Sequence, residues 1–249
     1  MELRRDNRRM VWAGEYVFGT AGAAFRGGAA DNVCHAHATL QIVASPDAPA
    51  IIERPGLPAT TGTYLLVRPG VIHALQPVER VTLVFLEPQT MAARRVLELS
   101  PLGDVVELPD ELRPPLQPNI ALAEGLASFE RTTAAPVDAR VAKALAYLAT
   151  SSGPRAVARA AAAAGVSASR LRALAHAQLD TPLTAWLAWR RLERAGKAMA
   201  AGATLAEAAV DAGFADQAHL SRVTRQVFGI TPGTAGGVVR VQANPSRPG

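Results

Sequence analysis

The chain has 249 residues, of which 49% are hydrophobic and 19% charged, a globular composition with enough length for two domains. No apolar run is long enough to span a bilayer, and the opening MELRRDNRRM lacks the apolar segment of a signal peptide, so we expect a cytoplasmic protein without a membrane segment. The single cysteine, Cys34, excludes an internal disulfide and is expected to be a small buried residue.

The formal net charge of +5 is unevenly distributed along the chain. From residue 137 onward there are 14 Lys or Arg against 6 Asp or Glu, whereas residues 1–136 carry 12 against 15. A basic C-terminal half is typical of proteins that bind a polyanion. This balance favours nucleic acid as a partner of the C-terminal half.

Short β-branched segments separated by Gly and Pro dominate residues 10 to 88. Their length and spacing predict an antiparallel sandwich or barrel. The segments are VWAGEYVFG (11–19), ATLQIVA (38–44), AIIER (50–54), TYLLV (63–67) and RVTLVFLEP (80–88).

Three histidines fall within this β region. His35 and His37, in CHAHATLQ, lie two apart on an expected strand and would share one face. His73 follows the turn at residues 69–70 in TYLLVRPGVIH. This pattern resembles cupin-type barrels, and the resemblance implies that an H-x-H pair, an acidic residue and the turn histidine enclose a metal ion. At the acidic position this chain has Gln41.

Two uses of these residues stay open. His35, His37 and His73 are candidate ligands of a divalent transition metal, since imidazoles suit Zn, Fe, Ni and Cu. Without an ion, His35, His37, Gln41 and His73 would line a pocket for a small-molecule effector in the barrel mouth. A domain used only for assembly is the remaining alternative.

The hydrophobic period changes to that of helices after residue 90. Residues 90–100 and 119–131 are predicted helices, separated by the proline-rich LRPPLQPN. Leu122, Leu126 and Phe129 lie on an apolar stripe of the second helix. This stripe either packs within the chain or forms the contact of a homodimer.

Residues 155–179 have the pattern of a helix-turn-helix. A helix of small residues is followed by a turn at Gly165 and by a second helix that Ser167 caps. Leu171, Leu174 and Ala175 face inward on this second helix. The outward arc holds Ser169, Arg170, Arg172, Ala173 and His176.

The pattern recurs over residues 204–232. Thr204 and Glu207 have the spacing of a capping box, Gly213 allows a turn, and Asp216 and Gly229 suit the two ends of the last helix. Leu220, Val223, Thr224 and Val227 are expected to face the core. The outward arc, whose arginines and amides suit a major groove, holds Gln217, Ala218, His219, Ser221, Arg222, Arg225 and Gln226.

A continuous helix is predicted between the two units. Residues 181–202, TPLTAWLAWRRLERAGKAMAAG, begin with Pro182 at a permitted position and end near Gly202. A rigid connector would fix the separation of the two outward-facing helices. For successive major grooves on one face of DNA, that separation is roughly 34 Å.

Residues 137–236 resemble the DNA-binding domain of AraC/XylS-type transcriptional regulators. The resemblance implies that Ser169 and Arg172 read DNA in the first unit, with Gln217, Ala218, His219 and Arg222 in the second. It rests on Gly213-Phe214, Asp216, His219, Ser221-Arg222, Phe228-Gly229 and Thr231-Pro232, and on Trp186-Leu187, Arg191-Leu192 and Ala195 of the connector.

Several positions depart from this family pattern. Ala173 and Ala175 stand where an arginine and an aromatic residue are usual, and Thr224 stands where Phe is usual. A Tyr-Arg pair that is common after residue 232 is replaced by Ala235-Gly236. We therefore expect the second unit to contribute more to DNA binding than the first.

Together these features predict an α+β protein. A cupin-like β-barrel or sandwich (1–90) would sense an effector, and a helical region (91–136) would mediate dimerisation. An all-α domain (137–241), with two helix-turn-helix units joined by a long helix, would bind DNA before a short tail (242–249).

The expected function is that of a sequence-specific transcriptional regulator, not an enzyme. Its partners would be double-stranded DNA, a small-molecule effector, a second copy of the chain and RNA polymerase. The alternatives are a metal-dependent cupin enzyme with a helical appendage and a regulator that needs no effector.

Overall fold

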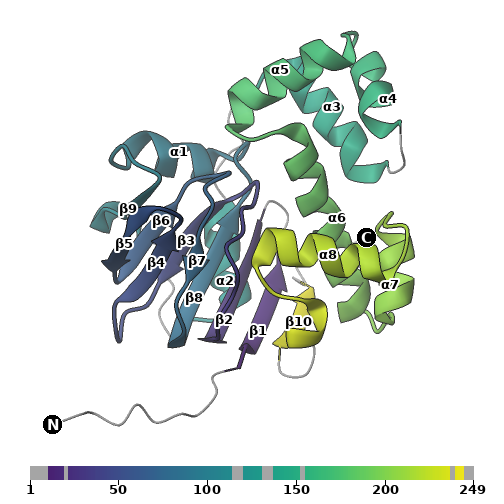
Figure 1. The fold of residues 1–249 in the computed structure, drawn as a ribbon. Coiled ribbons are helices and arrows are strands. Elements are labelled where there is room, and N and C mark those ends of the chain that lie inside the picture. Colours follow the sequence, from purple (N-terminus) through teal and green to yellow (C-terminus); the bar gives the residue numbers. More distant parts are fainter. Residues whose placement is uncertain are drawn as a thin grey trace, which may run out of the picture.

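A computed structural model describes residues 11–19, 22–113, 120–130, 137–151, 155–235 and 239–243. The fold is α+β, with an N-terminal β part followed by a helical part, as predicted (Figure 1). The side chain of Phe129, one of the expected dimer residues, lies outside the described part of the chain. Most of the predicted tail, 242–249, lies outside it as well.

The larger of two sheets has seven strands in the order β10-β1-β2-β8-β3-β6-β9. All neighbours are antiparallel except β1 and β10, which are parallel. The strands are β1 (Ala13–Phe18), β2 (Gly22–Ala29), β3 (Leu40–Ala44), β6 (Tyr64–Val67), β8 (Val78–Leu86), β9 (Val105–Glu107) and β10 (Val239–Ala243).

A smaller sheet has the order β5-β4-β7, with strands β5 (Leu57–Gly62), β4 (Ala50–Arg54) and β7 (Ala74–Leu75). The sequence predicts a regular strand for the segment with His35 and His37, and this prediction is wrong. Instead, the backbones of His35 and His73 form an isolated antiparallel bridge with two N–H···O bonds of 2.9 Å. His35 and His37 still lie close together.

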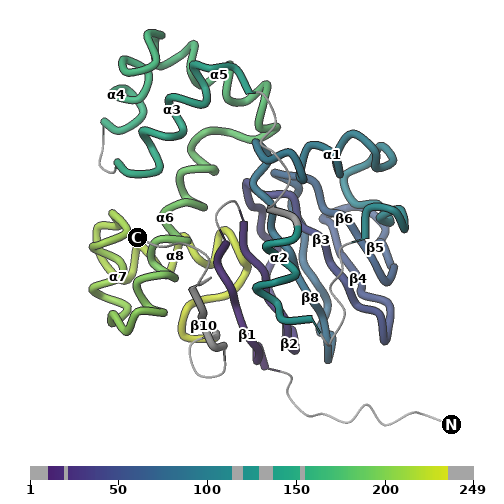
Figure 2. Tube along the Cα trace, turned by 180° about the vertical axis from the view of Figure 1, so that it is seen from behind, coloured from purple at the N-terminus to yellow at the C-terminus, as the bar shows by residue number. Residues whose placement is uncertain are grey.

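Both faces of the large sheet are covered. On one face, Val17, Ala24 and Val84 pack against the helices α1 (Met91–Leu99) and α2 (Leu122–Glu130). Figure 2 shows α2 lying across this face. Leu122 and Leu126 are fully buried there, so these two expected dimer residues pack within the chain. A short 3₁₀ helix, Asp110–Leu112, precedes α2.

The opposite face of the sheet carries the aromatic side chains of Tyr16, Phe18, Phe25 and Phe85. Phe25 and Phe85 point to this side, away from Ala24 and Val84, because neighbouring residues in a strand alternate between faces. They pack in the same core as the helical part of the chain. A cavity described below is lined by residues of this face.

The helical part contains the two expected helix-turn-helix units. The first is α4 (Ala156–Ala163) and α5 (Ala168–Leu179), preceded by α3 (Ala139–Thr150). The second is α7 (Leu205–Asp211) and α8 (Gln217–Phe228). The connector is α6 (Leu183–Ala200), with α5 and α8 at its opposite ends (Figure 1). A four-residue helix, α9 (Pro232–Ala235), follows α8.

The predicted ends of these helices are confirmed. Ser167 and Asp216 accept hydrogen bonds from backbone N–H groups of the first turns of α5 and α8, and Thr204 and Glu207 form a capping box on α7. Gly229 ends α8 in the left-handed conformation, with φ of 71°. None of the described helices combines the length and the hydrophobicity needed to cross a bilayer.

Candidate functional site

The predicted reading face of α5 is open to solvent. Ser169, Arg170, Arg172 and His176 are all exposed, while Leu171 and Ala175 on the other side of the helix are fully buried. The Ser167 hydroxyl accepts a hydrogen bond from the Arg170 N–H and thereby fixes the first turn. The exposed side of α5 therefore offers two guanidinium groups and an imidazole to a polyanion.

The predicted reading face of α8 is also mainly open. Gln217, Ala218, Arg222 and Arg225 are exposed, and Ser221 is half-buried. His219 is half-buried because its ring lies 5.3 Å from that of Phe214 and its Nδ1 accepts a hydrogen bond from the Ala215 N–H. The structure thus brings the predicted residues of this unit onto one helix, with His219 partly engaged in the turn.

The inner side of α8 has a second role. Leu220 and Val227 are buried in the core. Leu220, Thr224 and Phe228 line a cavity between α8, α6 and the large sheet. The Thr224 hydroxyl donates to the Leu220 carbonyl at 2.8 Å, which keeps it within its own helix. One helix therefore borders both solvent on its basic side and a cavity on the other.

The C-terminal end of α8 is fastened to the β part by the segment 32–36. The Val33 N–H donates to the Gly229 carbonyl at 3.1 Å, and the Ala36 N–H donates to the Gln226 carbonyl at 3.4 Å. The approach at Gly229 is very close, since a Cβ there would lie 2.4 Å from the Val33 carbonyl oxygen and 2.8 Å from His35 Nδ1. Only glycine fits this contact and the left-handed φ.

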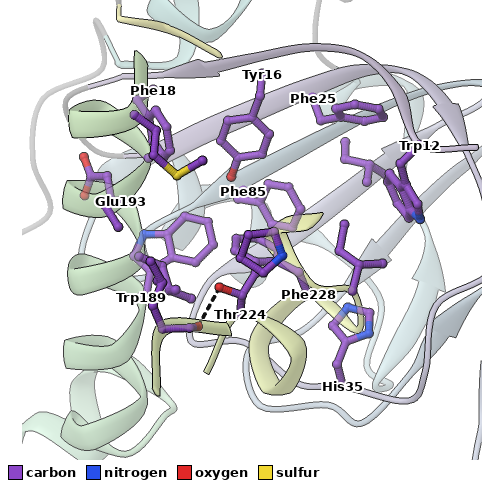
Figure 3. A pocket seen from close by; sticks show the side chains of 18 of the residues that line it. Trp12, Tyr16, Phe18, Phe25, His35, Phe85, Trp189, Glu193, Thr224 and Phe228 are labelled. Carbon is purple, nitrogen blue, oxygen red and sulfur yellow. Dashed lines mark hydrogen bonds between the residues drawn. The ribbon is translucent and has the colours of Figure 1, made fainter. Parts of the chain in front are cut away.

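The cavity has a volume of about 400 Å³ and is shown in Figure 3. The chain has three Trp, three Tyr and six Phe, and seven of these residues line the cavity. Trp12, Tyr16, Phe18, Phe25 and Phe85 come from the β part. Trp189 and Phe228 come from α6 and α8. The volume falls in the range of small-molecule sites.

The aromatic rings join the two parts of the chain. The ring centroids of Phe85 and Trp189 are 5.5 Å apart, and that of Phe228 lies 5.8 Å from Phe85 and 5.7 Å from Trp189. These separations are those of favourable aromatic pairs. A molecule in the cavity would touch the sheet, the connector and the reading helix together.

A cluster of ion pairs lies between the β part and α6, beside the cavity. Arg190 Nη1 lies 2.6 Å from Glu87 Oε1 and 2.6 Å from Glu193 Oε2, and Lys197 Nζ lies 2.6 Å from Glu193 Oε1. Both carboxylates are almost completely buried. Burial raises the pKa of Glu87, and Arg190 opposes this rise. Glu87 follows β8 and Arg190 lies on α6, so the pair crosses the interface.

The three predicted histidines of the β part do meet. His35, His37 and His73 are buried, and one ligand nitrogen of each lies within 4.8 Å of the others. Burial lowers the pKa of all three rings, to about 4 for His35. Each ring is therefore neutral at pH 7, the state in which imidazole binds metal.

Backbone contacts orient these rings. The Nδ1 atoms of His35, His37 and His73 lie 3.0, 2.8 and 3.0 Å from the carbonyl oxygens of residues 33, 39 and 71. A neutral ring whose Nδ1–H donates to a carbonyl leaves a lone pair on Nε2. This arrangement directs acceptor nitrogens towards one another.

Gln41 lies between two of these rings. Its Oε1 is placed 2.6 Å from His37 Nε2 and 3.1 Å from His73 Nε2. Because the His73 Nε2 is an acceptor in the neutral ring, we assign the amide NH₂ of Gln41 to this position, from which it can donate to both rings. His35 Nε2 is not part of this network.

The cavity and the histidine cluster share an edge. His35 and Gln41 line the cavity, whereas His37 and His73 do not.

Cys34 is exposed, against the expectation that it is buried, because the segment around it runs over the surface. The wall formed by α6 and α8 was not predicted. The only sequence signal for the aromatic wall is that Tyr16 and Phe18 share one face of β1.

The chain is similar to known proteins in sequence over part of its length and in fold over most of it. Residues 160–235 match the family described as Helix-turn-helix domain. No curated protein matches the chain by sequence. Among solved structures, ToxT from Vibrio cholerae O395 is similar over 88% of this chain and 100% of its own, with a TM-score of 0.54 and 10% identity.

Two further ToxT structures agree with this likeness. A ligand-free variant from V. cholerae strain SCE256 is similar over 86% of this chain and 96% of its own, with a TM-score of 0.53 and 11% identity. ToxT from V. cholerae O395 bound to (E)-4-(8-methylnaphthalen-1-yl)but-3-enoic acid is similar over 86% and 97%, with a TM-score of 0.51 and 9% identity. At these identities the likeness shows a shared fold.

Proposed function

We propose that the protein is a cytoplasmic transcriptional regulator controlled by a small-molecule effector, because residues 160–235 match the helix-turn-helix family and 88% of the chain is similar in fold to ToxT. The family match confirms the resemblance of this region to AraC/XylS-type regulators. DNA would be bound by the exposed sides of α5 and α8, and the effector by the cavity between the sheet, α6 and α8.

One observation supports this proposal above the others: α8 belongs to both sites. Its outer side presents Arg222 and Arg225 to solvent, and its inner side contributes Leu220, Thr224 and Phe228 to the cavity. A ligand in the cavity can therefore change the position of α8 without contacting DNA. Because the cavity walls come from both the β part and α8, a ligand would bind more tightly when α8 lies against the β part than when it has moved away. An effector needs such a difference in affinity between two arrangements in order to shift their equilibrium.

In this structure the C-terminal end of α8 is docked on segment 32–36 of the β part. This contact suggests whether the effector raises or lowers the affinity for DNA. Segment 32–36 binds the carbonyl of Gln226, which lies on the outward arc of α8, and exposed Asp31 precedes this segment. A duplex that follows the whole of α8 would meet this segment and a carboxylate. We therefore assign the docked arrangement to low DNA affinity and expect the effector to stabilise it.

The ToxT complex supports the use of the fold for ligands. ToxT binds a small molecule that combines a naphthalene ring with an acid, and the cavity of this chain has aromatic walls. In this chain a small molecule would stabilise the docked arrangement by RT ln(1 + [L]/Kd). Selection of bound sequences from a randomised DNA pool, with and without cell extract, tests the regulator proposal as a whole.

Arg222→Ala is expected to weaken binding to the selected DNA site by about 1–3 kcal/mol and to relax the preference at one base pair, because an arginine fork pairs with a guanine edge. Arg172→Ala should have a smaller effect, since Ala173 in the first unit stands where the family usually has an arginine. Fluorescence anisotropy with the selected site and with single-base variants measures both quantities.

Arg95→Ala is the matched control, since Arg95 is an exposed arginine on α1, outside both helix-turn-helix units. It removes the same charge and should leave the base preference unchanged. If Arg222→Ala and Arg95→Ala weaken binding equally and neither alters the preference, α8 does not read bases.

A second proposal concerns the histidine cluster, which would hold a divalent transition metal. Three neutral imidazoles with converging nitrogens fit Zn, Ni, Cu or Fe, and the amide of Gln41 would have to turn away from the rings. His35 also lies beside Gly229 at the docked end of α8. A bound ion would hold the segment that fastens α8 and would thereby favour docking.

Titration of the metal-free protein with Co²⁺ tests this second proposal. One equivalent should bind and produce visible absorption bands, and His37→Ala should lower the affinity at least tenfold. His176→Ala, which removes an exposed histidine on α5, is the control and should bind Co²⁺ normally. Equal binding by both variants, or no binding by the native chain, would rule out the cluster as a metal site.

Assembly as a homodimer and contact with RNA polymerase are part of the same proposal. Leu122 and Leu126 are buried against the sheet, so they are not available for the dimer contact. The dimer would use another surface of the helical region or of the β part. Sedimentation of the full chain measures this assembly directly.

A further inference from the structure

We infer that the cavity between the sheet, α6 and α8 takes an uncharged aromatic molecule with a hydrogen-bond acceptor, and that it discriminates against carboxylates. This inference rests on the proposed effector site and specifies its ligand class. It follows from three properties of the walls: their aromatic surface, the absence of lysine and arginine among the described lining residues, and buried donors that have no partner there.

The shape of the cavity favours a flat ring system. Tyr16, Phe25 and Phe85 lie along the sheet side, and Trp189 and Phe228 lie along the helical side (Figure 3). Space between them exists because the residues around it on the helices are small: Ala195, Gly196 and Ala200 on α6, and Thr224 on α8. A larger side chain at position 224 would occupy this space from α8.

The charges around the cavity disfavour an anion. No lysine or arginine is among the described residues that line it, and its one carboxylate is that of Glu193. The nearby cations are already used: Arg190 binds Glu87 and Glu193, and Lys197 binds Glu193 and the Gly19 carbonyl. A ligand carboxylate would be buried near Glu193 without a counter-ion, which is strongly unfavourable.

The imidazole in the lining, His35, is already paired within the chain. Its Nδ1 lies 3.0 Å from the Val33 carbonyl oxygen, so this nitrogen is held by the backbone and is not available to a ligand carboxylate.

The cavity lining holds three buried donors without acceptors among the described residues, namely the indole Nε1 atoms of Trp12 and Trp189 and the Tyr16 hydroxyl. The Tyr16 hydroxyl is shielded from solvent and has no hydrogen-bond partner among the described residues. Figure 3 shows this hydroxyl directed into the space among the rings. Burial and then Glu193 raise the pKa of Tyr16, so the hydroxyl keeps its proton and can donate. A buried donor without an acceptor is unfavourable, and a ligand carbonyl would satisfy it.

Two probes that differ in charge at one position test the inference. Methyl 2-naphthoate and 2-naphthoate share the ring system and the carbonyl, but only the second is an anion at pH 7.5. Binding to the full chain is followed by quenching of tryptophan emission, since Trp12 and Trp189 line the cavity. We expect the ester to bind at least tenfold more tightly than the acid. Tyr16→Phe should weaken ester binding by roughly fivefold to tenfold, the effect of one lost hydrogen bond.

Thr224→Phe supplies the control for the site, because the added ring would fill the cavity from α8. Ala200→Leu fills it from α6 and serves if the first variant does not fold. Both should abolish binding of the ester. If the acid binds as tightly as the ester, or if Tyr16→Phe binds the ester normally, the ligand class is wrong while the cavity remains a binding site. If neither probe binds, or the filled variants bind the ester unchanged, the cavity is no effector site and that part of the proposed function fails.

Discussion

Gly229→Ala is expected to release the C-terminal end of α8 from the β part and to raise the affinity for the selected DNA site about fivefold or more. The added Cβ would meet the Val33 carbonyl oxygen at 2.4 Å and His35 Nδ1 at 2.8 Å, so the docked contact cannot persist unchanged. If docking holds the protein in the arrangement of low DNA affinity, its loss removes that penalty. Anisotropy titration with the selected site measures the change, and the cavity should lose affinity for its ligand in the same variant.

Gly56→Ala separates the clash from the backbone effect. Gly56 has φ of 72° and lies in the turn between β4 and β5, outside both helix-turn-helix units, and nothing lies within 4 Å of its added Cβ. Alanine at either position carries the left-handed penalty of about 1–2 kcal/mol. Only Gly229→Ala should also alter DNA affinity and ligand binding. The same DNA affinity in both variants would mean that the docked end of α8 has no regulatory role.

Arg190→Met is expected to lower the free energy of unfolding by about 3–5 kcal/mol, because it leaves Glu87 buried without its cation. The loss should depend on pH in a defined direction. Burial raises the pKa of Glu87, and removal of Arg190 raises it further. A folded-state pKa above the unfolded value favours the fold only while the group is protonated, so the deficit should grow as the pH rises from about 5 to 8. Urea unfolding at several pH values measures this.

Two variants serve as controls for that prediction. Glu87→Gln combined with Arg190→Met removes the buried charge and should recover much of the stability at pH 8. Lys197→Met should cost less than about 1 kcal/mol, because the Lys197 side chain is 42% exposed and water screens its contact with Glu193. A pH-independent loss in Arg190→Met would contradict the assignment of Glu87 as the unpaired group.

The helix-turn-helix units could be predicted from the sequence because their signals are local. Ser167, Asp216 and the pair Thr204 and Glu207 cap their own helices within three residues, and Gly229 ends α8 where its left-handed φ was expected. The connector likewise follows from an uninterrupted helical period between Pro182 and Gly202. Contacts this short in sequence do not depend on the rest of the fold.

Three strands of the large sheet were not predicted from the sequence. β2, GAAFRGGA, has no β-branched residue, yet it pairs with β1 and β8 in the middle of the sheet. Its Gly27 faces Gly14 of β1 so closely that a Cβ on Gly27 would lie 2.0 Å from the Ala13 carbonyl oxygen. β9 falls in the region predicted to be helical and pairs with β6, and β10 was assigned to the helical domain and its tail but pairs with β1 from the far end of the chain. The pairings of β9 and β10, and that of β2 with β8, are with strands distant in the sequence.

The cavity could not be predicted for the same reason. Its walls join residues 12–85 to residues 189–232, and neither set marks a pocket by itself. The histidines, by contrast, were identified by their spacing, and the structure brings them together. The sequence indicated which residues carry polar chemistry, whereas the apolar site and the docking of α8 depend on how the two parts of the chain meet.

Amide hydrogen exchange at Val33 and Ala36, with and without the selected DNA, tests most directly whether α8 links the cavity to DNA. These two N–H groups donate to the carbonyls of Gly229 and Gln226 at the docked end of α8. We predict that DNA speeds their exchange at least tenfold while the amides of β8 keep their rates. Unchanged or slower exchange at both positions would contradict the coupling of docking to DNA binding.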